Sequence, residues 1–241
     1  MSTDRGRLAT RLALESFVII GSILAAFALD TWWDQRQERA EEQETLSALQ
    51  VEFEQARMDV EWYGSGQVRI LDAVTLLVDE LHAAWRAGRR TVTLPDTALG
   101  LAYVPPTVSP TLGTLEGLVS SGRLGLLRDR ELRTALGGWG TELAELTEEE
   151  TSSRDLTEED LDRVLRARIN TVGLWDVGAA IIGETLTPEA RAGMREVPVD
   201  TEVMGVLEQR RTLLYHTRGE YADLRAEIDN ILALIERSLN R

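Results

Sequence analysis

The sequence predicts an all-α protein in which an N-terminal transmembrane helix continues into a long amphipathic helix, and a long C-terminal helix closes a helical bundle. Three observations predict this fold. Residues 12–33 form an almost continuously apolar stretch. Apolar residues then recur every three or four positions within residues 34–88 and within residues 199–241, which is the spacing of a helix seam. Most of the prolines fall within residues 89–110, so irregular structure is expected there.

The composition narrows the chemistry that the chain can perform. All 26 basic residues are arginines, cysteine is absent, and His82 and His216 are the only histidines. These absences exclude a P-loop lysine, a Schiff-base lysine, a thiol nucleophile, a disulfide and a thiolate metal site. The net charge of -15 argues against binding to nucleic acid. We therefore expect no catalytic residue, no cofactor and no metal site, and we expect both histidines to have packing or surface roles.

Residues 1–11 are interpreted as a short cytoplasmic segment, and residues 12–33 as a transmembrane anchor. As a helix, the anchor is about 33 Å long, which matches a bilayer core of roughly 30 Å. The uncharged stretch between Glu15 and Asp30 is shorter, and residues 26–28 resemble a signal-peptide cleavage site. A carboxylate inside the apolar region is unusual for a signal peptide, so an uncleaved anchor is the favoured interpretation.

At about 100° per residue, one narrow sector of this helix carries mainly small and polar residues, namely Glu15, Ile19, Ser22, Ala26, Asp30 and Trp33. Gly21 and Ala25 match the small-xxx-small pattern of packed membrane helices. The favoured interpretation of the two carboxylates is that they mark the two headgroup levels, and contact of this side with a protein partner is compatible with it. The expected packing residues are Glu15, Gly21, Ser22, Ala25, Ala26 and Asp30, and the expected interfacial residues are Trp32 and Trp33.

The placement of the arginines predicts the orientation of the anchor. Arg5, Arg7 and Arg11 precede the span, whereas Arg36 and Arg39 follow it. The positive-inside rule then favours a cytoplasmic N-terminus. The main domain is expected in the periplasm, on a single-pass protein of the bacterial inner membrane.

Residues 34–88 are predicted to form a long coiled-coil-like helix beyond the membrane. The apolar phase that starts at Leu46 persists across residues 64–66, which read Gly-Ser-Gly. The sequence therefore allows one continuous helix, or two nearly coaxial helices with a soft joint. Gly88 is expected to end the helix. Residues 64–66 lack the preceding strand and the nearby base of a nucleophile loop.

Residues 89–110 are expected to form a loop with one short strand, and residues 111–198 to form short helices. A helix is predicted to begin after Ser109, which precedes a proline, and to end at Gly122. Asp129 is predicted to open the next helix. These signals divide the middle of the chain into short elements.

The acidic run at residues 145–162 invites comparison with a calcium site. Its spacing lacks the glycine and the final glutamate of a calcium-binding loop. We therefore interpret the run as a solvated connector in which Asp155 caps the next helix. The apolar residues 173–183 are too few to span a membrane, so they are expected in the core or on a surface that contacts a membrane or partner.

Residues 199–241 are predicted to form a second long helix, with Asp200 as its N-cap. Its apolar seam is nearly as long as that of residues 34–88. Two long amphipathic helices of similar length are expected to pair antiparallel, with the shorter helices completing a bundle.

The chain resembles an uncharacterised family of bacterial single-span membrane proteins. The resemblance is carried by residues 15–32, ESFVIIGSILAAFALDTW, and by residues 115–124, LEGLVSSGRL, with residues 129–133, DRELR. It covers most of residues 12–146. The resemblance implies an N-terminal anchor and a helical domain of unknown function, and it supplies no catalytic residue.

Two classes of function follow. In the first, the chain is a non-enzymatic accessory subunit that braces or tethers a larger membrane protein complex, through other membrane subunits and the bilayer. An energy-transducing complex, such as a photosynthetic reaction-centre or light-harvesting assembly, is the expected setting, and its pigments would be ligated by other chains because no histidine precedes His82. The alternative is a membrane-anchored periplasmic sensor or ligand-binding domain that uses Arg123, Arg128 and Arg133.

Overall fold

The structure is a computed structural model of the 241-residue chain. It describes the backbone of residues 3–105, 108, 110–183, 185 and 187–240, and the side chains of these residues from Ile20 onward. Most of this backbone is helical, which confirms the predicted all-α class. Within the described side chains, no helix is both long enough and apolar enough to cross a membrane. Residues 12–33, the expected transmembrane anchor, are helical, but the described side chains do not identify them as a membrane span. The side chains of residues 12–19 lie outside the described part.

The elements are named in chain order. They are α1 (Thr3–Arg86), β1 (Thr91–Pro95), α2 (Asp96–Ala102), α3 (Gly113–Ser120), the 3-10 helix η1 (Arg123–Leu126), α4 (Arg130–Asp155), the π-helix η2 (Leu156–Leu161), α5 (Asp162–Arg166), α6 (Leu174–Ile182), α7 (Pro188–Arg191), β2 (Met194–Pro198) and α8 (Thr201–Leu239).

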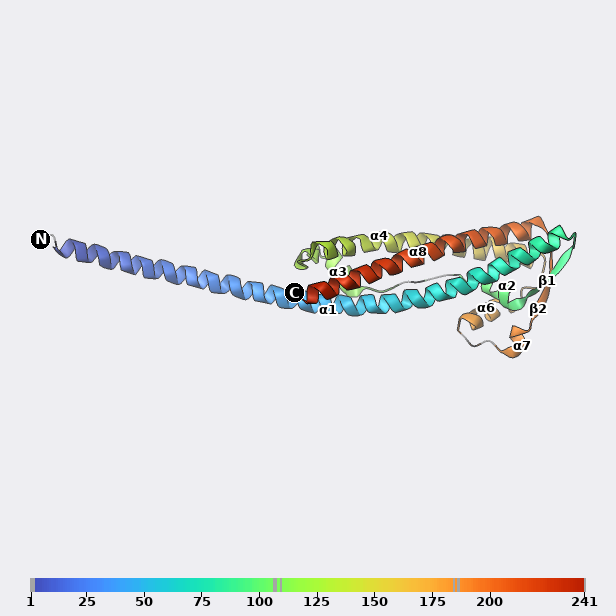
Figure 1. Ribbon diagram of the computed structural model, residues 1–241, viewed down its shortest axis with the longest axis horizontal. Coiled ribbons are helices and arrows are strands. Elements are labelled where there is room, and N and C mark those ends of the chain that lie inside the picture. Colours follow the sequence, from blue (N-terminus) through green and yellow to red (C-terminus); the bar gives the residue numbers. More distant parts are fainter. Residues whose placement is uncertain (1–2, 106–107, 109, 184, 186, 241) are drawn as a thin grey trace.

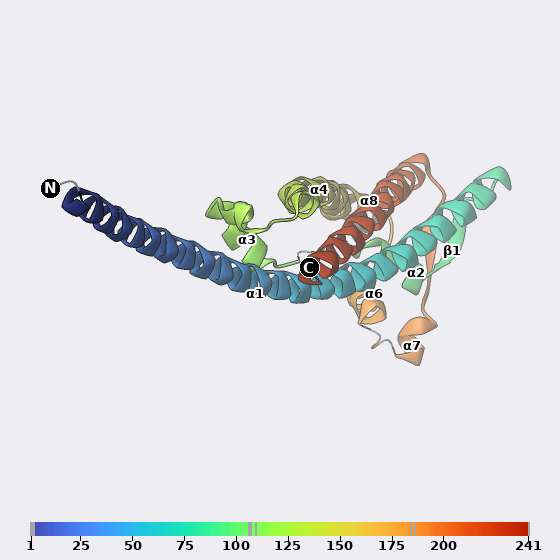
Figure 2. The ribbon, with the colours of Figure 1, turned by 60° about the vertical axis from the view of Figure 1, so that its left-hand side comes forward.

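Helix α1 runs the whole length of the molecule as one gently curved helix (Figure 1). Helix α8 packs antiparallel against its C-terminal part, as the sequence predicts, and α4 packs against α8. Figure 2 shows α6 and α7 on the opposite side of α1 from α4. The helix is unbroken through Gly64 and Gly66, so the single-helix alternative describes it and no joint interrupts it.

Several predicted helix boundaries agree with the structure. Gly88 and Gly122 follow α1 and α3 in the left-handed conformation, with φ of 66° and 68°, which glycine adopts without a Cβ clash. Asp129 and Asp200 cap α4 and α8, and each carboxylate accepts backbone N–H groups of the first turn. The start of α3 differs, because its N-cap is Leu112 without a side-chain cap and Ser109 lies outside the described residues.

The described part of residues 89–110 contains more regular structure than the expected loop with one strand. β1 is the predicted short strand, and it pairs antiparallel with β2, with Thr93 opposite Glu196. Helix α2 follows β1 directly and was not predicted, because its seven residues are too few to show a helical period. It crosses α6 where Gly100 meets Gly178, and a Cβ on Gly178 would overlap the carbonyl group of Gly100.

The middle of the chain contains a long helix in place of short ones. Helix α4 has 26 residues and continues through the π-helix η2 into α5, so Asp155 lies inside a helix and caps nothing. The predicted connector at residues 145–162 is therefore helical, whereas most of its acidic side chains are exposed to solvent, as predicted. Glu150 and Ser153 are buried in it, because the neighbouring elements cover one face of this helix.

The bundle contains two apolar clusters stacked along its length. The distal core lies at the end with the sheet, and the proximal core lies at the end where α1 leaves the bundle. Polar side chains gather at or near the boundary between the two cores. These boundary residues are Gln67 of α1, Glu150 and Ser153 of α4, and Arg210, Thr217 and Tyr221 of α8.

Candidate functional site

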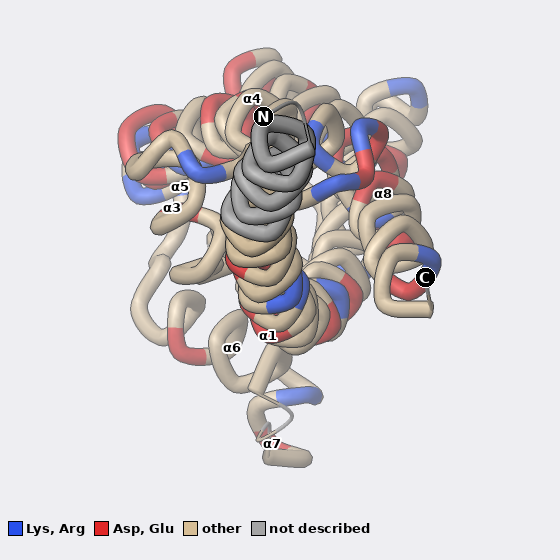
Figure 3. The backbone as a smooth tube through the Cα atoms, turned by 90° about the vertical axis from the view of Figure 1, so that its left-hand side faces the viewer, with Lys and Arg blue, Asp and Glu red and all other residues tan. Residues whose placement is uncertain are grey.

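The first candidate site is the part of α1 that projects from the bundle, residues 3–40, which we call the arm. At 1.5 Å per residue the arm extends roughly 55 Å. Every described side chain from Ile20 to residue 40 is exposed, including large apolar ones such as Phe27 at 65% and Leu29 at 66%. Figure 3 looks along the arm and shows that its described outer part carries few charged positions, whereas acidic residues and arginines spread over α4 and α8.

The arm carries the membrane-packing residues that the sequence singles out. Gly21 has no heavy atom within 4 Å of an added Cβ, so there is open space for another helix to approach it closely. Ser22, Ala25, Ala26 and Asp30 are exposed on the same helix. The side chain of Glu15 lies outside the described residues. Of the two interfacial tryptophans, Trp32 lies 5.7 Å from the Arg36 guanidinium carbon in a cation–π contact, and Trp33 is exposed.

The predicted arginine site is already occupied by contacts within the chain. Arg123 pairs with Glu41, where the arm enters the bundle. Arg128 pairs with the carboxylate of Glu42 at 3.3 Å, and Arg133 donates to backbone carbonyl groups at the start of α4. Arg123 and Arg128 therefore connect η1 and the chain after it to α1. Arg133 bonds only to the chain just before α4, and the three arginines do not converge on one pocket.

Val104 and Val108, in the chain between α2 and α3, contact the polar residues at the boundary of the two cores. Backbone groups outside helices and strands need other partners, and here side chains supply them. Nη2 of Arg210 donates to the carbonyl oxygen of Val104 at 2.7 Å. Glu150 accepts the N–H of Val108 at 2.9 Å. Buried side chains from α8 and α4 thus hold Val104 and Val108 against the bundle.

Burial changes the acid–base behaviour of these boundary groups. Burial raises the pKa of Glu150, although the Tyr221 hydroxyl and the Val108 N–H, which both donate to the carboxylate, partly oppose the shift. Burial and the hydrogen bond to Glu150 raise the pKa of Tyr221. Burial lowers the pKa of Arg210 to about 9. The side chain is fully buried, and its Nη1 donates to the Ser153 carbonyl oxygen at 3.1 Å. The boundary is therefore a polar layer in which the buried ionisable groups Glu150 and Arg210 form hydrogen bonds to neutral partners.

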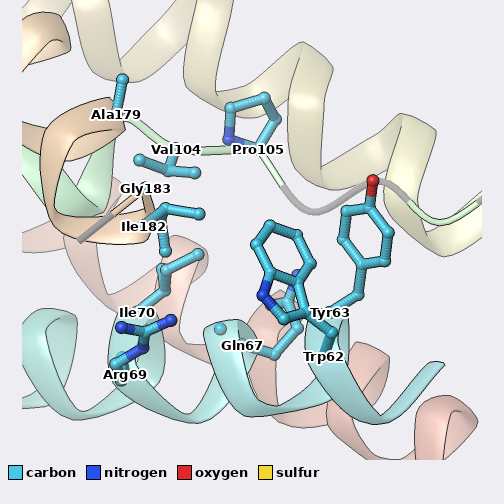
Figure 4. A pocket seen from close by; sticks show the side chains of 11 residues that line it. Trp62, Tyr63, Gln67, Arg69, Ile70, Val104, Pro105, Ala179, Ile182 and Gly183 are labelled. Carbon is cyan, nitrogen blue, oxygen red and sulfur yellow. The ribbon is translucent and has the colours of Figure 1, made fainter. Parts of the chain in front are cut away.

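The second candidate site is a pocket beside this layer, between α1, α6 and the chain that follows α2 (Figure 4). Its volume is about 390 Å³, and its walls are mainly apolar. Trp62 and Tyr63 form one side in an edge-to-face pair with ring centroids 4.8 Å apart. The lining residues used below are Trp62, Gln67, Arg69, Val104, Pro105 and Ile182.

The histidines do not mark a site in the described part of the chain. His82 contacts Glu208 across the α1–α8 seam, and His216 is exposed. Among the described residues, no group of three or more His, Cys, Asp and Glu side chains could hold a metal ion. Trp175 of the apolar residues 173–183 is half exposed on α6, while Leu174 is buried, so this segment contributes to the core and to the surface.

Sequence reasoning did not identify the boundary layer or the pocket. Gln67 lies at a seam position of α1, and a polar residue at such a position is the only local signal that something unusual faces it. No local sequence feature distinguishes Glu150, because it is one acid among many.

No protein-family model matches the chain, and no curated protein and no solved structure matches it.

Proposed function

We propose that this protein is a non-enzymatic accessory subunit that tethers an acidic helical bundle to a larger membrane protein complex. In this proposal the arm docks against membrane helices of other subunits, within or at the surface of the bilayer. The observation that carries it is the arm itself, whose described side chains, from Ile20 onward, are exposed and include large apolar ones, and which is continuous with the helix that organises the bundle.

The energetics of the arm support an external partner. Apolar surface transferred out of water contributes about 25 cal/mol per Å². An exposed helix that carries Ile23, Leu24 and Phe27 gains this free energy when lipid or another helix covers it. Gly21 adds a surface that allows close approach of a second backbone.

The continuity of α1 supports the tethering role. A docked arm and the bundle share one helix, so the position of the arm dictates the position of the bundle. Ion pairs at the exit, Arg123 with Glu41 and Arg128 with Glu42, connect η1 and the chain after it to α1 at this point. The proposed orientation has the N-terminus in the cytoplasm and the bundle in the periplasm, where an acidic surface avoids anionic lipid.

The docking role is tested by changing the small face of the arm. Gly21→Leu with Ala25→Leu should reduce the amount of partner that copurifies from gently solubilised membranes, because two leucines prevent close helix approach, while membrane association persists. The matched control, Ile23→Leu with Phe27→Leu, changes the opposite face and should copurify normally. Equal recovery of partners with both double variants would refute docking through the small face.

The orientation is tested with a single introduced cysteine, since the chain has none. Ser152 is exposed on α4, so Ser152→Cys should react with a membrane-impermeant thiol reagent in cells that lack only the outer barrier. Ser2→Cys in the same cells should react only after lysis of the inner membrane. The reverse pattern would place the bundle in the cytoplasm.

A further inference from the structure

We propose that the pocket between α1 and α6 binds a small, flat aromatic acid that carries a hydroxyl or N–H donor. This inference is independent of the tethering role, because it depends on the boundary of the two cores and not on the arm. It also moves ligand binding away from Arg123, Arg128 and Arg133, which have partners within the chain.

The evidence for a ligand begins with Gln67. Its side chain is only 3% exposed, and it lines the pocket. Its Oε1 is buried without a hydrogen-bond partner, and no hydrogen bond from its amide nitrogen is formed to any described residue. An amide buried in this way is destabilising unless a partner binds to it. In Figure 4 the side chain rises from α1 beside the indole of Trp62.

The walls of the pocket indicate a flat apolar body. Trp62 supplies an aromatic surface, and Val104, Pro105 and Ile182 supply aliphatic surface across from α1. Aromatic side chains prefer offset-stacked or edge-to-face contacts with other rings. A volume of about 390 Å³ lies within the ordinary size range of small-molecule sites. One wall is held in place from the core side, because Arg210 donates to the carbonyl oxygen of Val104.

Arg69 indicates the charge of the ligand. Its side chain is half-buried on the pocket wall, and within the described part of the chain it forms no ion pair. In contrast, Arg57, which lies earlier on α1, forms an ion pair with Asp229 of α8 at 3.8 Å. A carboxylate or sulfonate on the ligand would complete the pairing of Arg69. A ligand that interacts with Gln67, Arg69 and Trp62 together is therefore an aromatic acid that carries a hydrogen-bond donor.

The test measures binding of two probes to the full-length chain by isothermal titration calorimetry. The probes are a naphthol sulfonate, which has a hydroxyl donor, and its methyl ether, which lacks that donor. We expect one probe per chain and an affinity about tenfold higher for the naphthol, because only the hydroxyl can donate to Oε1 of Gln67. No measurable binding of either probe, or equal affinity for both, would overturn the proposal.

Variants then assign the binding to this pocket. Gln67→Leu should abolish the preference for the naphthol, because the leucine leaves no acceptor. Trp62→Ala should weaken both probes at least tenfold, whereas Trp85→Ala should not, although Trp62 and Trp85 are 51% and 52% exposed on the same helix. Equal loss in both tryptophan variants, or a naphthol preference that survives Gln67→Leu, would contradict the assignment.

The charge requirement has its own matched pair. Arg69→Gln should reduce the affinity for the naphthol sulfonate about tenfold, whereas Arg57→Gln should leave it unchanged. Circular dichroism and thermal melting establish that each variant is folded. If Gln67→Leu does not fold, the two probes on the unaltered chain and the two tryptophan variants still decide the outcome.

Discussion

One helix contains both an isolated arm and the central helix of a bundle, and the comparison shows what makes a helical face a core. Phe27 in the arm is 65% exposed, whereas Phe53 in the bundle is fully buried and contacts Trp139 edge to face, with ring centroids 5.1 Å apart. The two residues share a helix and a side-chain type. They differ in their neighbours, because α4 and α8 pack in the bundle around Phe53, whereas no element covers Phe27 in the described structure.

The same contrast applies to polar residues. Asp30 in the arm is exposed, whereas Asp129 caps α4, accepts two backbone N–H groups and pairs with Arg237 of α8 at 2.9 Å. Tertiary neighbours thus determine whether an aspartate forms structural contacts or is exposed to solvent. The exposed side chains of the described arm are the ones that a partner could cover.

The largest expected effect comes from the phenylalanine pair. Phe53→Ala should lower the free energy of unfolding by about 3–5 kcal/mol, because it removes a buried ring and leaves a cavity against Trp139. Phe27→Ala should change it by less than about 0.5 kcal/mol, as for an exposed residue. Urea denaturation followed by circular dichroism measures both. A large effect of Phe27→Ala would show that the arm folds back onto the bundle.

The glycine pair should give the next largest effect. Gly178→Ala should destabilise the bundle by about 1–3 kcal/mol, because the new Cβ overlaps the backbone of Gly100. Gly21→Ala meets no neighbouring atom in the arm and should instead stabilise the helix slightly. Thermal melting distinguishes the two signs. Stabilisation by Gly178→Ala would show that α2 and α6 do not cross at the two glycines.

The aspartate pair tests the contribution of the negative charge at the α4 N-cap, because asparagine caps a helix about as well as aspartate. Asp129→Asn should cost about 1–2 kcal/mol near neutral pH, since it weakens the contact with Arg237, while Asp30→Asn should cost nothing measurable. Burial of Asp129 opposes ionisation, but the Leu132 N–H and the Arg237 guanidinium outweigh it and lower the pKa. This stabilisation is therefore present above the unfolded pKa of 3.8 and lost as pH falls through the lower folded pKa. A pH-independent cost would contradict this origin.

The smallest expected effect is the pH dependence that Glu150 contributes. Because burial raises its folded pKa, its stabilising contribution is complete below the ordinary glutamate pKa of 4.5 and is lost as pH rises through the folded pKa. Glu150→Gln should remove this decline, whereas Glu38→Gln, at an exposed position of the arm, should leave it unchanged. Urea midpoints measured between acid and neutral pH provide the comparison. An unchanged profile for Glu150→Gln would show that the carboxylate is solvated.

The features that the sequence predicts correctly are local. The periodic seams of α1 and α8 follow from side chains one or two turns apart, and the caps at Asp129 and Asp200 act on backbone groups within three residues. Gly88 and Gly122 end their helices through their own φ angles. Each of these depends on chain geometry over a few residues, so sequence pattern alone is sufficient.

The features that were missed depend on contacts between residues far apart in the chain. The acidic connector was predicted to be solvated, yet Glu150 is buried because Val108 and Tyr221 donate to it from other elements. The short helix α2 exists where Gly100 meets Gly178, and the pocket exists where α6 and the segment after α2 pass Gln67. Packing between elements decides which acid, amide or glycine has such a neighbour. The spacing of residues along the sequence does not predict this packing.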